Sequence, residues 1–417
     1  MRYLRSSGFV SLYLLFLVGM TWGCAEGEHR KDIADQMRDA QTVTYGSATA
    51  HYSKGLDEQA RCFAGTVDAQ LSYIQSFTGY EFQSVFRKCD VYLKLLGPNE
   101  SSKSFFCHGG EQPLLVDPNK TSCADIVEKN DLDYPFAWAH ELVEGSLCWG
   151  KYAGTTPRLL LDGNQPAPGG KATDNVNYTR WFREGFASYC GILACRAADL
   201  NQGPGRGKIR SEMLDRKQDL APFSSLAMVG KRLFAWWQYD DYADFVPDPN
   251  LPKGSVPEAI HYDAALGLFL LIEARYGQRA IKEIIHEVNR LQNGTGEDLK
   301  RIVSKAIGTD VVGLVEGFRF PNVGMTLSPA YRPFVASADV PIKDGLLADV
   351  ADNSPAQRAG IKTADIVLSL DGEPTLRHFD FECALYKHMQ QKTVRIGIRR
   401  KGAGPTSVEM VEMKLGD

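Results

Sequence analysis

Three residues within one short stretch carry side chains that could bind a cation. His140 and Glu144 lie four residues apart, with Glu141 beside them, in the largely apolar segment 135–145. Four residues are about one helical turn, so on a helix His140 and Glu144 share a face. Burying an imidazole and two carboxylates among apolar side chains is costly unless a cation or hydrogen-bond donors compensate them. The spacing therefore indicates a candidate metal site.

Two later segments place further polar groups on apolar helices. Residues 178–198 are predicted to form a second helix, in which Glu184 is the one acidic residue of an otherwise apolar face. His261, Tyr262 and Asp263 then open a strongly apolar helix, predicted over 264–276 and ended by Gly277.

The three segments together resemble the gluzincin metallopeptidases. Residues 181–189 match the W-x-x-E-G-x-A-x-Y helix of that family, and 261–277 is similar to its later segment, in which a Tyr begins a helix. The resemblance implies three metal ligands, with Glu144 in the place of the second His of HExxH: His140, Glu144 and Glu184. It also implies that Glu141 is the general base and that the Tyr262 hydroxyl stabilises the oxyanion.

The departure from the family is HExxE in place of HExxH. A third anionic group should make a metal-bound water less acidic, and it favours harder cations relative to zinc. Zn²⁺, another divalent cation or no metal therefore remain open. The segment 150–177, rich in Gly, Pro and Asn, lengthens the distance in sequence between Glu144 and Glu184 and is interpreted as a surface insertion.

The C-terminal segment 344–372 resembles a bacterial PDZ domain. It has Ser-Pro-Ala-x-x-Ala-Gly over 354–360, Ala364-Asp365 where the family has Gly-Asp, and an Asp371-Gly372 turn. The resemblance implies that an extended peptide adds to a sheet edge and places its carboxylate in a loop, here Val323, Gly324 and Met325. The alternative is a structural PDZ domain that packs on the first domain. A peptidase domain followed by PDZ is similar to the glycyl aminopeptidase family.

The fold class predicted is α+β. A mostly helical, thermolysin-like domain with a small sheet is expected over 45–320, and a β-barrel-like PDZ domain over 321–417. Helices are predicted at 56–78, 278–291, 296–307 and 380–390, besides those that carry the site. Strands are predicted at 89–96, 113–116, 346–350, 366–370, 394–399 and 408–415.

The N-terminus has the features of an export signal. Arg2 and Arg5 precede an uncharged, mostly apolar run over 9–20, which predicts a signal peptide over 1–23. Cys24 follows Gly23 as in a bacterial lipoprotein box, so lipidation of Cys24 and a flexible tether over 24–44 are expected, with plain export as the alternative. The expected location is the bacterial cell envelope or periplasm, with a lipid anchor in the membrane.

Export would place the remaining eight cysteines in an oxidising compartment. Cys62 with Cys89, and Cys107 with Cys123, are candidate disulfides. The net charge of −4 on 417 residues gives no electrostatic reason to expect a nucleic-acid partner.

Two functions from different classes follow from these observations. The first is an exported, metallopeptidase-like hydrolase that cleaves peptides or proteins, with the PDZ domain helping to select them. The second is a catalytically inactive, peptidase-like scaffold that holds polypeptides through the PDZ domain and the cleft.

Overall fold

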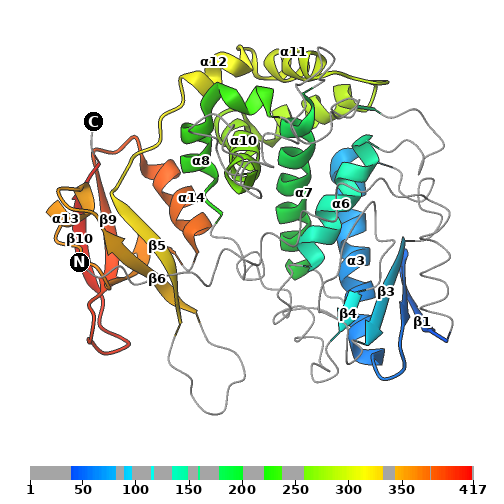
Figure 1. Ribbon diagram of the computed structural model, residues 1–417, viewed down its shortest axis with the longest axis horizontal. Coiled ribbons are helices and arrows are strands. Elements are labelled where there is room, and N and C mark those ends of the chain that lie inside the picture. The colour runs from blue at the N-terminus through cyan, green and yellow to red at the C-terminus, as the bar shows by residue number, and fades with distance from the viewer. Residues whose placement is uncertain are drawn as a thin grey trace, which may run out of the picture.

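The computed structural model describes residues 39–80, 89–95, 114–116, 134–148, 158–159, 178–200, 220–236, 258–331, 343–375 and 377–415. The predicted signal peptide, Cys24, Cys107 and Cys123 lie outside these residues, as does most of the segment 150–177. The α+β class is confirmed: helices fill the middle of the molecule and two sheets lie at its ends (Figure 1). Among the described residues, no helix is both long and apolar enough to cross a membrane.

The N-terminal sheet has the strand order β1-β2-β3-β4. β1 (Gln41–Tyr45) and β2 (Ala48–Tyr52) form an antiparallel hairpin, and β2 pairs in parallel with β3 (Cys89–Leu95), as β3 does with β4 (Leu114–Val116). The connection from β2 to β3 runs through α3 (Asp57–Thr78), as a parallel pair requires. β1 begins at Gln41, inside the segment 24–44 that was interpreted as a flexible tether. Residues 41–44 instead form part of a strand that pairs with β2.

Helices form the core around the site. They are α6 (Tyr134–Cys148), α7 (Arg180–Leu200), α8 (Pro222–Val229), the 3₁₀ helix η3 (Gly230–Ala235), α10 (Glu258–Val288), α11 (Gly296–Ile307) and α12 (Val311–Glu316). α10 begins three residues before His261. The break predicted at Gly277 is present as a non-helical residue (φ 77°, ψ 166°) at which two helical segments meet.

Glycines on α7 allow it to approach two neighbouring helices closely. A Cβ at Gly185 would lie 2.6 Å from the carbonyl oxygen of Ala265 on α10, and a Cβ at Gly191 would lie 2.9 Å from the ring of Phe136 on α6. Real Cβ atoms do not approach that closely, so these two positions require glycine. Because Gly185 follows Glu184 directly, the first contact brings Glu184 close to the start of α10.

The C-terminal sheet has the order β10-β9-β7-β6-β5, which leaves β5 (Met325–Tyr331) at its end. The other strands are β6 (Lys343–Val350), β7 (Ile366–Leu370), β8 (Glu373–Pro374), β9 (Thr393–Arg399) and β10 (Glu409–Lys414), with helices α13 (Pro355–Arg358) and α14 (His378–His388). This domain has its own cluster of buried apolar residues, separate from the core of the helical domain.

The turns of this domain agree with the sequence motif. Ser354 caps α13 by accepting a hydrogen bond from the Gln357 N–H at 3.1 Å. Asp371 and Gly372 both have positive φ (46° and 86°), as a two-residue hairpin turn between β7 and β8 requires. Ala364, which stands where the family has Gly, also has positive φ (74°), a conformation that costs a non-glycine residue about 1–2 kcal/mol.

The two domains meet where α14 contacts α8 (Figure 1). Ala221, the residue before α8, makes no side-chain cap. The buried carboxylate of Glu382 on α14 instead accepts hydrogen bonds from the Phe223 N–H at 2.7 Å and from the Ser224 N–H and hydroxyl. A side chain of one domain therefore caps a helix of the other, which satisfies donors that a helix start leaves unpaired.

Glu382 should make the stability of the protein depend on pH. Burial raises its pKa to about 7, although the hydrogen bonds from Ser224 and Phe223 lower it. The folded protein thus keeps this proton up to about pH 7, whereas the unfolded chain releases it near pH 4.5. The resulting stabilisation is complete below pH 4.5 and is lost as the pH rises through 7. Relative to Glu382→Gln, the free energy of unfolding of the wild type in urea should fall by about 3 kcal/mol between pH 4.5 and 8. A difference in the free energy of unfolding between the two proteins that stays constant over this pH range would contradict this prediction.

Candidate metal and peptide sites

His140 and Glu184 are brought together by the packing of α6 against α7. His140 Nε2 lies 3.1 Å from Glu184 Oε2, and His140 Nδ1 lies 3.2 Å from the hydroxyl of Ser188, one turn further along α7. Both His140 and Glu184 are buried, with 8% and 5% of their surface exposed. Both imidazole nitrogens are therefore held by side chains of α7, which fixes the orientation of the ring.

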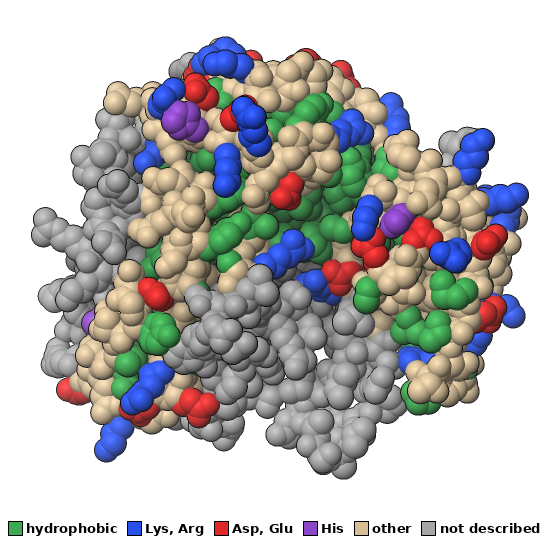
Figure 2. Space-filling model, turned by 180° about the vertical axis from the view of Figure 1, so that it is seen from behind, with side chains coloured by type: hydrophobic (Ala, Val, Ile, Leu, Met, Phe, Trp, Pro, Cys, Tyr) green, Lys and Arg blue, Asp and Glu red, His purple; other side chains and the backbone are tan. Residues whose placement is uncertain are grey.

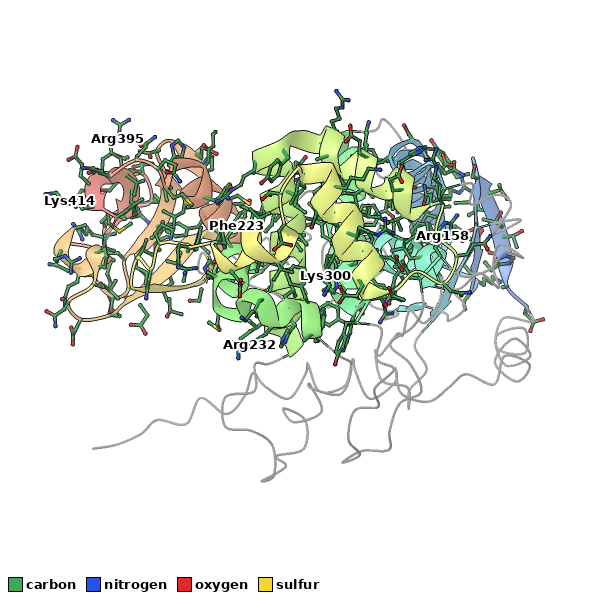
Figure 3. All side chains as sticks on the ribbon, turned by 90° about the horizontal axis from the view of Figure 1, so that it is seen from above. Arg158, Phe223, Arg232, Lys300, Arg395 and Lys414 are labelled. Carbon is green, nitrogen blue, oxygen red and sulfur yellow. The ribbon has the colours of Figure 1, made fainter. Side chains whose placement is uncertain are left out.

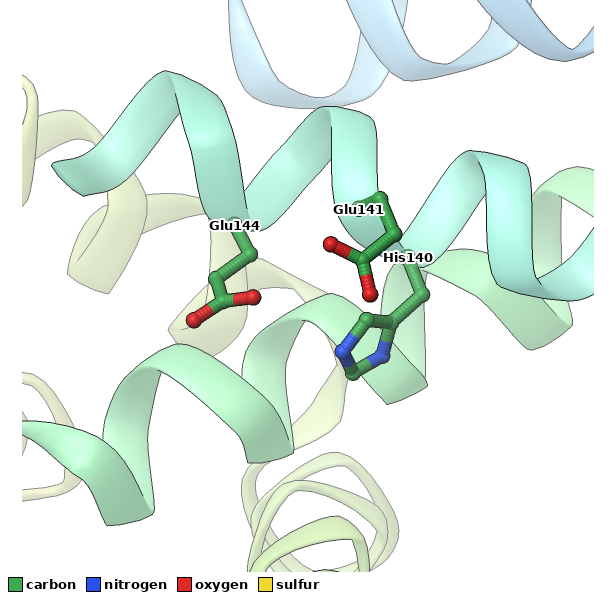
Figure 4. Close-up of side chains that lie close together, drawn as sticks. All are labelled: His140, Glu141 and Glu144. Atoms are coloured by element: carbon green, nitrogen blue, oxygen red, sulfur yellow. The ribbon is translucent and has the colours of Figure 1, made fainter. Parts of the chain in front are cut away.

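Glu141 and Glu144 lie beside His140 on the same helix (Figure 4). One potential ligand atom from each of the three residues can be chosen so that all lie within 4.8 Å of one another. Glu184 is not in that group of three but contacts His140 directly. The three predicted metal ligands and the predicted base, Glu141, therefore lie close together.

Burial and mutual charge set the ionisation of this cluster. Burial alone would lower the pKa of His140, but the hydrogen bond to Glu184 and the neighbouring carboxylates raise it to about 9. Burial alone would raise the pKa of Glu184, but the hydrogen bond from His140 and the charge of Arg180 lower it to about 2. Burial and the charge of Glu144 raise the pKa of Glu141 well above its ordinary value.

Two arginines of α7 enter the same cluster. Arg183 Nη1 donates to Glu144 Oε1 at 2.7 Å, and Arg180 Nε lies 3.5 Å from Glu184 Oε1. Both arginines are buried, at 6% and 3% exposed. Burial and the charge of Glu184 raise the pKa of Glu144, and Arg183 opposes that rise. Two of the three carboxylates therefore have a guanidinium partner.

Tyr262 reaches the cluster through Arg180. Arg180 Nη2 donates to the Tyr262 hydroxyl at 3.1 Å, and its guanidinium lies over the Trp236 ring at 4.4 Å. Because an arginine can only donate hydrogen bonds, the Tyr262 oxygen is the acceptor here. The proton of Tyr262 is thus directed away from Arg180, and Arg180 joins the start of α10 to Glu184.

The donor set fits a divalent cation in kind. One imidazole and several carboxylates are ligands for zinc and, as carboxylates increase, for harder cations. The 3.1 Å between His140 Nε2 and Glu184 Oε2 is close to the separation that two ligands about 2 Å from one ion would have. A cation bound there would share Glu144 and Glu184 with Arg183 and Arg180.

Sequence reasoning missed the two arginines. Arg180 and Arg183 precede Glu184 by four residues and by one, in a helix whose neighbours are apolar. A cation in such a helix requires a buried acidic partner, and Glu184 and Glu144 were already candidates. An acidic partner for each arginine could therefore have been expected, although the sequence did not show which carboxylate each would meet. Ser188, which contacts His140, carried no signal of its own.

The loop predicted to bind a peptide carboxylate contains one residue in the left-handed region, Gly324. Gly324 has φ 68°, and a Cβ there would lie 2.1 Å from the Cβ of Ser354. The Gly324 N–H is bonded to the side chain of Asn322 at 2.9 Å, and the carbonyl of Val323 accepts from the Ala356 N–H at 3.1 Å. Val323 is buried, and Met325 begins β5 at the end of the sheet.

The described cysteines include both a disulfide-bonded residue and free thiols. Cys62 on α3 is disulfide-bonded, whereas Cys190 on α7 and Cys383 on α14 have free thiols. The pairing of Cys62 with Cys89 stays a prediction.

Comparison with protein families supports the assignment of the C-terminal domain. Residues 321–407 match the PDZ domain family, so this part of the chain is a PDZ domain. The chain is also 29% identical over 87 residues to the magnetosome formation protease MamE of Magnetospirillum gryphiswaldense. That similarity covers 21% of this chain and only 11% of MamE.

Comparison with solved structures finds more distant similarity over a larger part of the chain. An aminopeptidase N family protein from Idiomarina loihiensis matches 90% of this chain and 66% of its own, with 14% identity and a TM-score of 0.40. Legionella pneumophila aminopeptidase A, in complex with aspartic acid, matches 80% of this chain and 33% of its own, with 11% identity and a TM-score of 0.36. Both scores are too low to define a common fold.

The largely buried pair of Arg183 and Glu144, whose side chains are 8% and 17% exposed, should matter more to stability than an exposed pair does. Arg183→Met leaves the Glu144 carboxylate without its cation in a buried site, so the variant should lose about 3 kcal/mol in urea unfolding. Adding Glu144→Gln should recover much of that loss. Lys231→Met, which breaks the exposed pair with Glu316, is the control and should change nothing measurable. Equal effects of the two single variants would contradict the importance of the buried pair.

Proposed function

We propose that this protein is a metallopeptidase-like hydrolase that acts on peptides or proteins, with a PDZ domain that binds polypeptide. The observation that carries the proposal is the convergence of His140, Glu141, Glu144 and Glu184 from two helices on one buried site. The Tyr262 hydroxyl accepts a hydrogen bond from Arg180, and Arg180 in turn contacts Glu184 of that site. MamE, similar over 87 residues, is named a protease, which agrees with the proposed class.

Each residue has a separate role in this proposal. His140, Glu144 and Glu184 would hold Zn²⁺ or a harder divalent cation, which would supply a Lewis acid beside the peptide carbonyl. Glu141 would take the proton of the attacking water, and a carboxylate whose pKa is raised by burial is suited to that exchange near neutral pH. Tyr262 would donate its proton in a hydrogen bond to the oxyanion that forms in the transition state.

The second candidate is a binding protein without catalysis, and a specific observation favours it. Arg183 and Arg180 already compensate Glu144 and Glu184, so the buried carboxylates have partners without a metal. In that case the PDZ domain would carry the function, by holding polypeptides. Export, the signal peptide over 1–23 and lipidation of Cys24 belong equally to both candidates and remain part of the proposal.

Metal content separates the two candidates. Purified wild-type protein should hold about one divalent cation per chain by elemental analysis, and Glu184→Gln should lose it. Glu144→His rebuilds the family's HExxH motif and should shift the preference toward zinc. If the wild type holds no metal while Glu144→His binds zinc, the hydrolase proposal fails and the binding protein stands.

Cleavage tests the role of Glu141. On a pool of quenched fluorescent peptides, Glu141→Gln should lower the rate at least about 100-fold, because it removes the proton acceptor. The metal content of Glu141→Gln should equal that of the wild type, which serves as the control for an intact site. Undiminished cleavage by this variant would show that the activity does not arise at this site.

A further inference from the structure

The first turn of α8 lies against two parts of the PDZ domain at once. The ring of Phe223 stacks on Tyr386 of α14, with 4.4 Å between ring centroids and 10° between planes. It also stacks on Phe320 at 5.7 Å. Phe320 immediately precedes the loop 321–324 that leads into β5. Phe223 is 2% exposed and lies at the junction of the two domains (Figure 3).

α14 and the segment that leads into β5 form the two sides of the groove in which a PDZ domain binds a peptide. Such a peptide adds to an open sheet edge, and β5 is the strand at the end of this sheet. α14 contacts β5 and lies alongside it. Phe223 is therefore inserted between α14 and the segment before β5, at the end of the groove where the predicted carboxylate loop lies.

The faces of α14 are consistent with this placement. Phe381, Ala384 and Leu385 pack into the PDZ core. Lys387, on another side, donates to Glu373 on β8 at 2.6 Å. The remaining face, at spacing i, i+3 and i+7, carries Phe379, Glu382 and Tyr386 and contacts the helical domain. Glu382 there binds two backbone N–H groups of α8, as described above.

We infer that the first turn of α8, residues 222–224, is an internal occupant of the PDZ groove. Phe223 fills its apolar end, and the Phe223 and Ser224 N–H groups satisfy the buried Glu382 carboxylate. An incoming peptide that ends in an apolar residue with a free carboxylate has to displace this turn. Peptide binding is thus opposed by the contact between the domains.

Displacing the turn would also release a contact near the candidate metal site. The Ala221 N–H donates to Asp263 Oδ2 at 2.9 Å, and Asp263 follows Tyr262 on α10. A Cβ at Gly267, one turn further along α10, would lie 2.1 Å from the carbonyl oxygen of Pro222, so α8 and α10 are in close contact. The start of α8 is therefore held by Glu382 on one side and by Asp263 on the other.

Variants of α8 test the inference without altering any residue of the PDZ domain. The probe is a fluorescein-labelled pool of ten-residue peptides, random except for a C-terminal valine with a free carboxylate. The full-length Phe223→Ala variant should bind the pool about tenfold more tightly than the wild type, as expected if the groove is open in about a tenth of wild-type molecules. Ser224→Asp, which places a second carboxylate beside Glu382, should have the same effect and disturbs less of the core.

The control changes the exposed end of the same helix. Met228→Asp introduces the same charge at a residue that is 59% exposed, and its affinity should equal that of the wild type. Equal affinity of all four proteins, or tighter binding by Met228→Asp as well, would overturn the inference.

Hydrogen exchange gives a second readout that requires no metal and no cleavage. In the wild type, saturating pool peptide should speed the exchange of the Phe223 and Ser224 amides, whereas a pool with amidated C-termini should not. Peptide that binds while these amides stay protected would overturn the inference. This proposal rests on peptide binding by the PDZ domain but not on hydrolysis. A failed cleavage assay would therefore leave it standing, whereas failure of every variant to bind would overturn it.

Discussion

The cost of burying charge governs the centre of this structure. Three carboxylates and an imidazole lie between α6 and α7; His140 and Glu184 are buried, and Glu141 and Glu144 are partly buried, so water solvates the cluster poorly. Such groups persist in a folded protein only when opposite charges and hydrogen bonds replace the water. Here the partners are Arg180 and Arg183 on α7, together with the hydrogen bond between His140 and Glu184. A metal would add a further partner to a cluster that already contains compensating charge.

That compensation depends on how closely the helices pack. Gly185 and Gly191 let α7 approach α10 and α6, and the residues that flank Gly185 on α7 then face both helices.

Charges of both signs are interspersed over the face in Figure 2, and apolar side chains gather at its centre. The described charges on this face are thus exposed to solvent, whereas Arg180, Arg183 and Glu184 are buried and paired.

Much of the architecture could be predicted from sequence, because periodicity reports which face of a helix is buried. α3, α7 and α11 were found in this way, and the PDZ turns followed from Ser354, Asp371 and Gly372. The hairpin of β1 and β2 was missed because β1 is mostly exposed, and two of the three residues that β2 buries are alanines, which give a weak apolar alternation. The site residues could be proposed by resemblance, but their partners could not. A pattern in one helix does not show which carboxylate of another helix an arginine will face.

The contact between the domains depends, like the candidate metal site, on the compensation of buried polar groups. Glu382 is nearly fully buried, and the partners that satisfy it are backbone donors of α8 rather than arginines. No sequence pattern predicts this pairing, because it depends on a helix start that lacks its own cap and on a carboxylate more than 150 residues away. Either partner alone would be left with an unsatisfied buried group, so separating the domains requires water to reach both. The junction is therefore best suited to two discrete states, docked and open, since a partly open junction would lose the hydrogen bonds before water could replace them.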